Sequence, residues 1–320
     1  HISANIIFQP GMIGRRAKMV EFKKANIKMA SQNASNIVFR KDYTAPDHQI
    51  ESIDLSFDLI PTCTEVTSKI IAVPQEDRKS DDLILDGDDL TLVSIKIAGE
   101  DSFPGQYDMR PGKLIIHNIK ERTEIEIVTR INPRNNLELS GLYMSKNNYI
   151  TQCESEGFRR ITYFPDRPDI LAKYRVVIRA PKDYKDLLSN GNLVEQGELL
   201  DGRNYAIWED PFPKPSYLFA LVAGNFVAQE QKVTLSDGRE ALLQIWTEPA
   251  NKGKTEFAMQ SLVKAIKWDE ERFGLDLDLD RFMIVATDDF NFGAMENKGL
   301  NIFNSKYVLA DENVATDQDF

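Results

Sequence analysis

The chain has 320 residues, of which 42% are hydrophobic and 28% are charged, and its formal net charge is −11. That length allows about two domains, and the composition is typical of a globular protein. The acidic balance argues against nucleic acid and anionic membranes as main partners, and no apolar stretch approaches the roughly 20 residues of a transmembrane helix. The two cysteines, Cys63 and Cys153, do not suggest a disulfide framework, which favours a reducing compartment such as the cytoplasm.

The first 28 residues differ from the rest because they are basic. They carry six Lys or Arg residues against one acid, Glu21, and lack the apolar segment of a secretory signal. A basic, acid-poor start is compatible with an organellar transit peptide. We favour Met29 as the natural start, with residues 1–28 as translated upstream or added sequence. We expect residues 1–39 to form a disordered basic extension.

From about Arg40 the sequence predicts short strands. Ile53, Leu55, Phe57 and Leu59 alternate with polar residues, the period-two pattern of a half-buried strand. Further strands are predicted at 91–97, 114–116 and 124–127, with turns at 86–87 and 111–112. This series predicts a mostly β domain, built as a sandwich or as an open saddle of sheets.

The pattern of predicted secondary structure changes after a proline-rich run. Pro211-Phe212-Pro213-Lys214-Pro215 predicts a stiff break, and the apolar residues 217–224 predict a buried strand after it. We place a domain boundary near Asn225, so that the β domain covers residues 40–225.

Residues 226–320 predict mixed α and β structure. Strands are expected at 241–246, 281–286 and 300–303. A helix is expected at 254–273, with Gly274 as its C-terminal stop. The apolar face of the helix is predicted to hold Met259, Leu262, Val263, Ile266 and Phe273.

The most informative motif is Gly293-Ala294-Met295-Glu296-Asn297. A glycine lets the backbone approach a ligand closely, and Glu296 adds a full negative charge three residues later. Such a combination suits a site that binds a peptide by its free amino end. A lone glutamate of this kind is more often a solvated surface residue, so the surrounding sequence has to decide.

Four segments, in the same order, resemble bacterial members of the M1 family of zinc aminopeptidases. They are TQCESEGFR at 151–159, DPFPKP at 210–215, KWDEERFGL at 267–275 and GAMENKGLNIFNSKYVLA at 293–310. The similarity runs from about Asp42 to Phe320. It implies a mostly β, saddle- or sandwich-like N-terminal domain at 40–225. It also implies that residues 226–320 are the first part of an α+β, thermolysin-like catalytic domain.

The resemblance assigns roles to particular residues. Glu296, as the catalytic-site residue, and Glu154 would hold the ammonium group of a peptide substrate. Glu156 lies close by, and only the family motif selects Glu154. Gln152 would line the pocket for the first substrate residue, and residues 293–295 would form an edge strand that pairs with the substrate main chain. The full set of expected substrate-binding residues is Gln152, Glu154, Phe292, Gly293, Ala294, Met295, Glu296 and Asn297.

Phe292 departs from the methionine that close bacterial relatives often carry. Phenylalanine is stiffer and bulkier than methionine, which adapts its shape to varied side chains. We expect a narrower or differently selective pocket for the first substrate residue.

The zinc motif of the family is missing from this sequence. The chain has only His1, His48 and His117, with no His-x-x-x-His spacing, so we expect no metal ligands within it. The resemblance implies one zinc ion in a longer enzyme, with ligands beyond Phe320, and we expect the 320-residue chain alone to be inactive. The expected parent is a monomeric aminopeptidase. A non-peptidase M1-fold scaffold for protein binding and an M1-type epoxide hydrolase are the alternatives.

Overall fold

The computed structural model describes residues 39–311 and 315–317. The chain divides into two compact units, residues 1–45 and 46–320. The expected disordered extension, residues 1–39, lies outside the described residues except for Phe39. The short helical turns of the 3-10 type are η1 (Arg40–Asp42), η2 (Pro133–Asn135), η3 (Phe158–Arg160), η4 (Ser216–Leu218), η5 (Pro249–Asn251) and η6 (Ser305–Tyr307).

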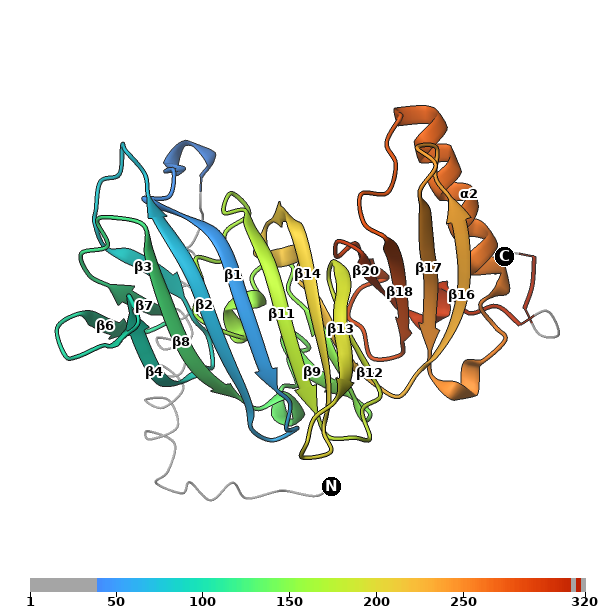
Figure 1. The fold of residues 1–320 in the computed structure, drawn as a ribbon, viewed down its shortest axis with the longest axis horizontal. Coiled ribbons are helices and arrows are strands. Elements are labelled where there is room, and N and C mark those ends of the chain that lie inside the picture. Colours follow the sequence, from blue (N-terminus) through green and yellow to red (C-terminus); the bar gives the residue numbers. More distant parts are fainter. Residues whose placement is uncertain (1–38, 312–314, 318–320) are drawn as a thin grey trace, which may run out of the picture. The chain divides into compact units, whose positions relative to one another are not determined.

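An eight-stranded sheet is the largest element of the second unit (Figure 1). Its strands, in spatial order, are β13 (Asn192–Glu198), β14 (Asn204–Lys214), β11 (Ala172–Ala180), β1 (His48–Asp58), β2 (Thr64–Pro74), β8 (Thr123–Ile131), β4 (Thr91–Ile97) and β5 (Glu100–Asp101). Strands β1 and β11 pair in parallel, and the other neighbours pair antiparallel. The period-two prediction for β1 is confirmed, because Ile53, Leu55 and Phe57 are at most 1% exposed.

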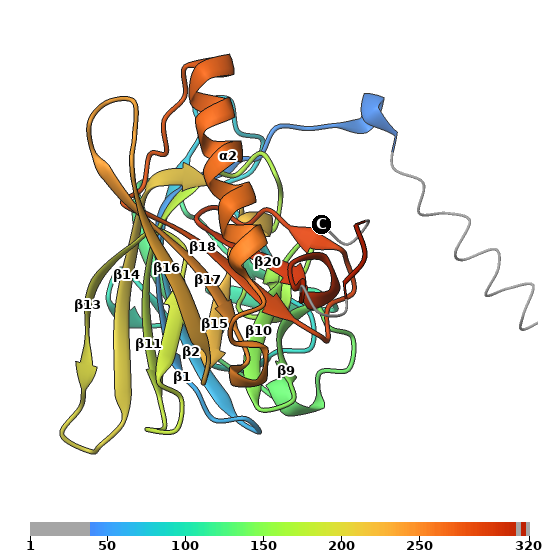
Figure 2. The ribbon, with the colours of Figure 1, turned by 90° about the vertical axis from the view of Figure 1, so that its right-hand side faces the viewer.

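Two smaller sheets complete the β region. The first runs in the order β12 (Asp186–Ser189), β15 (Leu221–Gly224), β10 (Asn148–Gln152) and β9 (Gly141–Ser145). The second runs in the order β3 (Leu83–Asp86), β7 (Lys113–Ile116) and β6 (Tyr107–Arg110). Figure 2 shows β9, β10 and β15 as a layer beside the large sheet. Buried side chains of all three sheets share one hydrophobic core, and the Trp208 indole of β14 donates to the carbonyl of Leu187 in β12 (2.8 Å).

The predicted break at 211–215 is wrong in part. Strand β14 continues through Pro211 and Pro213 to Lys214, which pairs with Ala172 of β11. Its other neighbour, β13, pairs with β14 only as far as Glu209, and the register between β14 and β11 shifts between Asp210 and Lys214. Residues 211–213 therefore pair with neither strand. Proline is tolerated at such an irregularity because no ladder N–H is needed there. The strand predicted at 217–224 is shorter than expected, since 216–218 form η4 and only β15 is extended.

A mixed five-stranded sheet follows residue 225. Its order is β16 (Val227–Thr234), β17 (Glu240–Thr247), β18 (Arg281–Thr287), β20 (Leu300–Asn304) and β19 (Ala294–Met295). Strand β18 is buried on both faces. Met283 and Val285 belong to the core shared with the β region, whereas Ile284 and Ala286 belong to a second core.

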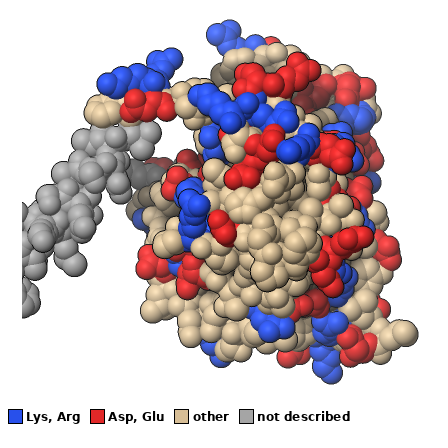
Figure 3. All heavy atoms as spheres, turned by 90° about the vertical axis from the view of Figure 1, so that its left-hand side faces the viewer, with Lys and Arg blue, Asp and Glu red and all other residues tan. Residues whose placement is uncertain are grey.

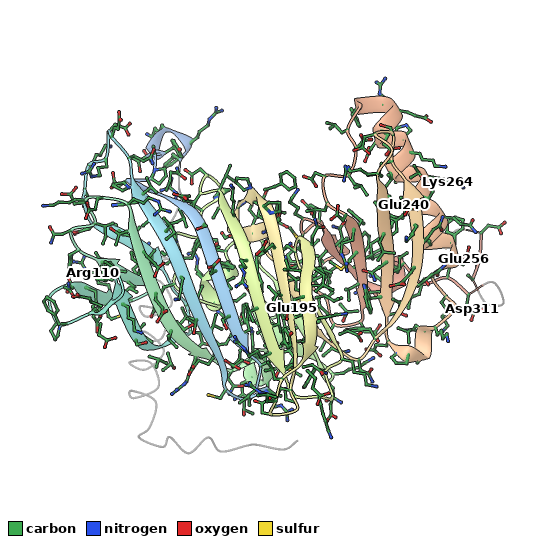
Figure 4. All side chains as sticks on the ribbon, in the orientation of Figure 1. Arg110, Glu195, Glu240, Glu256, Lys264 and Asp311 are labelled. Carbon is green, nitrogen blue, oxygen red and sulfur yellow. The ribbon has the colours of Figure 1, made fainter. Side chains whose placement is uncertain are left out.

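Helix α2 (Glu256–Phe273) covers the face of this sheet that carries the second core (Figure 2). It begins two residues later than predicted and ends at Gly274, whose φ of 65° is the left-handed conformation that favours glycine at a helix end. Met259 and Ile266 are buried as predicted. The prediction that Phe273 lies on the same buried face is wrong, because Phe273 is 59% exposed and its ring makes an edge contact with Trp268. Glu256, labelled at the start of α2 in Figure 4, accepts a hydrogen bond from Gln229 of β16 (2.6 Å).

Two surface properties bear on the expected partners. Within the described residues, none of the helices has the length and apolar character needed to cross a bilayer. On the face drawn in Figure 3, Lys and Arg side chains are interspersed with Asp and Glu side chains around an uncharged area. This face therefore presents mixed charge rather than one continuous basic surface.

Candidate substrate-binding site

The central motif lies on β19, at the end of the mixed sheet. Ala294 pairs with Phe303 and Met295 pairs with Ile302 of β20, in the antiparallel sense. No described strand pairs with the other side of β19. The motif is therefore an edge strand, which leaves one row of backbone groups available to another extended chain.

The hydrogen-bond pattern identifies which backbone groups face outward. The Gly293 carbonyl accepts from the Asn304 N–H (3.0 Å). Opposed residues in an antiparallel ladder alternate between hydrogen-bonded and non-bonded pairs, so Ala294 and Phe303 form a non-bonded pair. The N–H and C=O of Ala294 therefore point away from β20, toward the unpaired edge.

Side chains along this segment alternate between solvent and core. Phe292, Ala294 and Glu296 are exposed, whereas Met295 and Asn297 are 1% exposed. The Met295 side chain belongs to the large shared core and fixes the strand against the β region. Consequently Glu296 and Phe292 share the exposed face of the strand.

The β region contributes Glu154, which lies in the loop that follows β10. Glu154 is exposed, and its carboxylate has no hydrogen-bond or ion-pair partner among residues 39–311 and 315–317. The rival candidate, Glu156, forms an ion pair with Arg159 (3.3 Å). The carboxylate of Glu296 also has no partner in the described part of the chain. The two glutamates selected by the motif are thus both available for a ligand, although no direct contact joins them.

Gln152 lies beneath the Glu154 loop. It is 2% exposed, and its side-chain amide donates to the Glu154 carbonyl oxygen (3.2 Å). Its Oε1 atom is buried and has no hydrogen-bond partner within the described residues. The neighbouring Cys153 is buried, and burial raises the pKa of its thiol well above the usual value. Gln152 thus supports the loop from below, and its place in a substrate pocket stays a prediction.

Sequence analysis did not select Tyr307, whose ring lies against Gly293. A Cβ atom built on Gly293 would come within 3.2 Å of the Tyr307 ring, which is itself 62% exposed. The aromatic ring thus covers the position where a larger residue would place its side chain. Only the turn of η6 after β20 brings the two residues together, so their separation in sequence carried no signal.

The loop before Gly293 is anchored to β9. The Tyr143 hydroxyl donates to the Asp289 carbonyl oxygen (2.9 Å), and the Ser145 hydroxyl donates to the Asp289 carboxylate (2.8 Å). Lys146 binds Asp288 (2.9 Å), and hydrogen bonds from Ser305 and Lys146 lower the pKa of the Asp288 carboxyl. Since β9 pairs with β10, these contacts fix the loop to the same small sheet that leads to Glu154.

The described residues do not fit a zinc site. They contain no group of three His, Cys, Asp or Glu side chains placed to hold a metal ion. His48 bonds the Ile119 carbonyl oxygen (2.9 Å), and His117 lies between Asp82 and Asp108 in the β region. A tetrahedral zinc site needs three or four converging ligands, which these contacts do not supply.

Comparison with known proteins places this arrangement in a family. Residues 45–218 match the peptidase M1 N-terminal domain, and residues 257–320 match the peptidase family M1 domain. The chain belongs to the M1 family of peptidases. The resemblance drawn from the four sequence segments is therefore confirmed.

Individual relatives agree with this assignment. The chain is 51% identical over 283 residues to aminopeptidase N of Escherichia coli K12, covering 88% of this chain and 32% of the relative. It is 50% identical over 287 residues to aminopeptidase N of Haemophilus influenzae, covering 88% and 33%. The crystal structure of Legionella pneumophila aminopeptidase A in complex with aspartic acid matches with a TM-score of 0.82 and 37% identity, covering 87% of this chain and 33% of that one. The chain thus spans about a third of the length of these proteins.

Proposed function

We propose that this chain is the N-terminal part of a zinc-dependent aminopeptidase that removes the first residue from peptides. Glu154 and Glu296 would bind the substrate ammonium group. The proposal depends mainly on the carboxylates of Glu154 and Glu296, which are exposed and have no partner within the described residues. Glu296 also follows edge strand β19, whose outer backbone groups are free to pair with a peptide. The names of the relatives, aminopeptidase N and aminopeptidase A, support the same activity.

The chemistry of the two glutamates suits an amino terminus. Carboxylates accept short, charge-assisted hydrogen bonds from an ammonium group. A free α-amino group has a pKa of about 7.7–8.0, and nearby negative charge favours its protonated form. Two carboxylates therefore bind the charged form of the amine and keep it protonated near neutral pH.

Strand β19 would align the rest of the substrate. The outward N–H and C=O of Ala294 can pair with the main chain of an extended peptide, as in other cases of strand addition. With the ammonium held at one end, the peptide extends in one direction only. That geometry explains removal of a single residue per turnover.

The exposed Phe292 would shape selectivity for the first residue. Its ring is 48% exposed and contacts the Phe290 ring edge-on, with 6.3 Å between the ring centroids. A ring braced in this way adapts less than a methionine does. We propose a pocket that is more selective among first-residue side chains than a methionine would allow.

The metal belongs outside this chain in our proposal. M1 aminopeptidases use a zinc ion, and the described residues do not offer its ligands. We therefore propose that the zinc ligands lie in the remaining part of a longer enzyme and that the 320-residue chain alone is inactive. We place the enzyme in the cytoplasm, since Cys63 and Cys153 are both free thiols. We also propose that it is a monomer.

Replacement of Glu296 tests the ammonium site. In the full-length enzyme, Glu296→Ala should lower kcat/KM for an alanyl anilide by about 10- to 100-fold, because hydrogen bonds to charged groups contribute roughly 1.5–3 kcal/mol. Glu154→Ala should behave similarly, and thermal unfolding should show that both variants fold. The matched control is Glu156→Ala, which removes an exposed carboxylate that already has a partner. Near-normal turnover by Glu296→Ala would refute the assignment.

A further inference from the structure

A buried amide side chain of the β region binds the segment that follows Glu296. Asn190, directly after β12, is 1% exposed, and its Nδ2 atom donates to the carbonyl oxygens of Lys298 (2.8 Å) and Leu218 (3.0 Å). Its Oδ1 atom accepts from the Ala220 N–H (2.7 Å). The Asn190 amide thus joins the β region to a backbone atom only two residues beyond Glu296.

Other contacts near Glu296 do not replace this bond. The Asn297 side chain is buried, but both of its polar atoms lack hydrogen-bond partners within the described residues. The Lys298 ammonium binds Asp278 at the surface, where an ion pair contributes little to holding a backbone. The Asn297 carbonyl oxygen accepts from the Asn301 side chain (2.8 Å), and the Gly299 carbonyl oxygen accepts from the Met283 N–H (3.0 Å), so both of these contacts lie within the mixed sheet. The bond from Asn190 instead ties the Lys298 backbone to the β region.

The turn itself is packed against the same loop. Gly299 has a φ of +73°, and a Cβ atom there would lie 2.7 Å from the Leu279 side chain and 3.7 Å from the backbone nitrogen of Gly191. Nearby, the Asn192 side chain accepts from the Asp280 N–H (2.9 Å). Residues 190–192 therefore pack against the turn formed by residues 297–299.

We infer that Asn190 is a positioning residue that fixes the Glu296 carboxylate for the substrate ammonium group. The inference rests on the proposed function. Loss of the bond to Lys298 frees the turn that ends the edge strand and lets Glu296 move relative to the bound amine. Displacements of about 1 Å in a binding site are enough to lower kcat/KM by up to about a hundredfold.

The test is a double-mutant cycle in the full-length enzyme. Asn190→Asp keeps the shape and the acceptor but replaces the two donors with a carboxylate. We expect kcat/KM for an alanyl anilide to fall about 10- to 100-fold, mainly through KM. In a Glu296→Gln background the same change should cost less than about twofold, because a residue that acts through Glu296 has no further effect there.

Asn204→Asp is the matched control. The Asn204 side chain also donates to two carbonyl oxygens, those of Lys182 (3.2 Å) and Tyr184 (2.9 Å), but it does not contact residues 288–299. This variant should retain its kcat/KM within about twofold. Amide hydrogen exchange of residues 296–300 should accelerate in Asn190→Asp and stay unchanged in Asn204→Asp. If Asn190→Asp fails to fold, Asn190→Ser, which keeps one donor, should show the same pattern to a smaller degree.

Two results would overturn the role of Asn190. One is an unchanged kcat/KM in both Asn190 variants. The other is an equal loss in the wild-type and Glu296→Gln backgrounds, which would indicate a general structural effect. Full activity of Glu296→Gln itself would instead refute the ammonium site and so the proposed function.

Discussion

Gly293 has a structural role in addition to any approach to a ligand. Its backbone does not adopt the left-handed conformation that only glycine favours, so alanine is compatible with its dihedral angles. What opposes a side chain there is the Tyr307 ring, at 3.2 Å from the position of a Cβ atom. The absence of a side chain at 293 therefore makes room for the ring.

This contact predicts that the effect of Gly293→Ala on the free energy of unfolding depends on whether the Tyr307 ring is present. Gly293→Ala reduces the entropy of the unfolded chain, which alone stabilises by about 0.4–1 kcal/mol. With Tyr307 present, the close contact should offset that gain, so urea unfolding should show little change or a slight loss. In a Tyr307→Ala background, Gly293→Ala should stabilise the protein. The contrasting control is Gly299→Ala, which should destabilise in either background because its φ is +73°. Equal effects of Gly293→Ala in both backgrounds would contradict this reading.

Sequence reasoning identifies residues whose role depends on local pattern. Glu296 and Glu154 lie in short motifs, and the structure shows both exposed and free of described partners. Tyr307 and Asn190 were not identified, because their roles come from contacts with Gly293 and Lys298 that the fold creates. The bond from Asn190 spans 108 positions in the chain, and no local spacing signals it.

At the scale of elements, strand β14 shows why a proline-rich run was misread. Pro211 and Pro213 lie in a short stretch of β14 that pairs with neither neighbouring strand. The same strand carries a buried ion pair between Lys214 and Asp210 (3.1 Å). The Lys214 ammonium also lies 3.6 Å from the centroid of the Tyr174 ring. Local propensity correctly predicts helix α2 and strands such as β4, β17, β18 and β20, but it does not show where a strand lacks a paired neighbour. The extent of β14 therefore depended on tertiary pairing.

The ion pair predicts asymmetric effects of substitution. Lys214→Met leaves the Asp210 carboxylate buried without its partner, and such changes typically cost about 3–5 kcal/mol. Lys214→Met combined with Asp210→Asn removes the unpaired charge and should be more stable than the single variant. Urea unfolding at pH 7 measures both. A double variant that is no more stable than Lys214→Met would show that the charge of Asp210 is not the source of the loss.

The same lysine predicts a pH dependence. Burial lowers the pKa of Lys214 to about 8 in the folded protein, against an ordinary value of 10.5. Between these values the unfolded chain binds the proton more tightly, so the contribution of Lys214 to the free energy of unfolding increases with pH. Below about pH 8 both states are protonated, and the cost of burying the charge is at its full size. The stability of the wild type relative to the double variant should therefore grow from pH 8 to pH 10.5, and a constant difference would contradict the shift.

At the scale of the whole unit 46–320, one hydrophobic core joins residues on both sides of position 225. The domain boundary near Asn225 remains a proposal. Alternate residues of β18 face two different cores, and Met283, Val285, Met295, Leu300 and Ile302 pack with the β region. The mixed sheet therefore uses the β region as one of its two covering layers. Hydrophobic periodicity predicts which residues of β18 are buried, but it cannot identify which partner each buried face meets.

This packing predicts that residues 226–320 do not fold alone. Fully burying a large apolar side chain contributes roughly 1.5–3 kcal/mol, and isolation would expose the five side chains that the sheet buries against the β region. A segment of residues 226–320 should therefore show no cooperative urea transition and should bind a hydrophobic dye. Residues 46–320, which keep both faces covered, are the matched control and should unfold in a cooperative transition. A sigmoidal transition for 226–320 without dye binding would show instead that the segment is stable without the β region, because helix α2 and the second core would then be sufficient to hold the sheet.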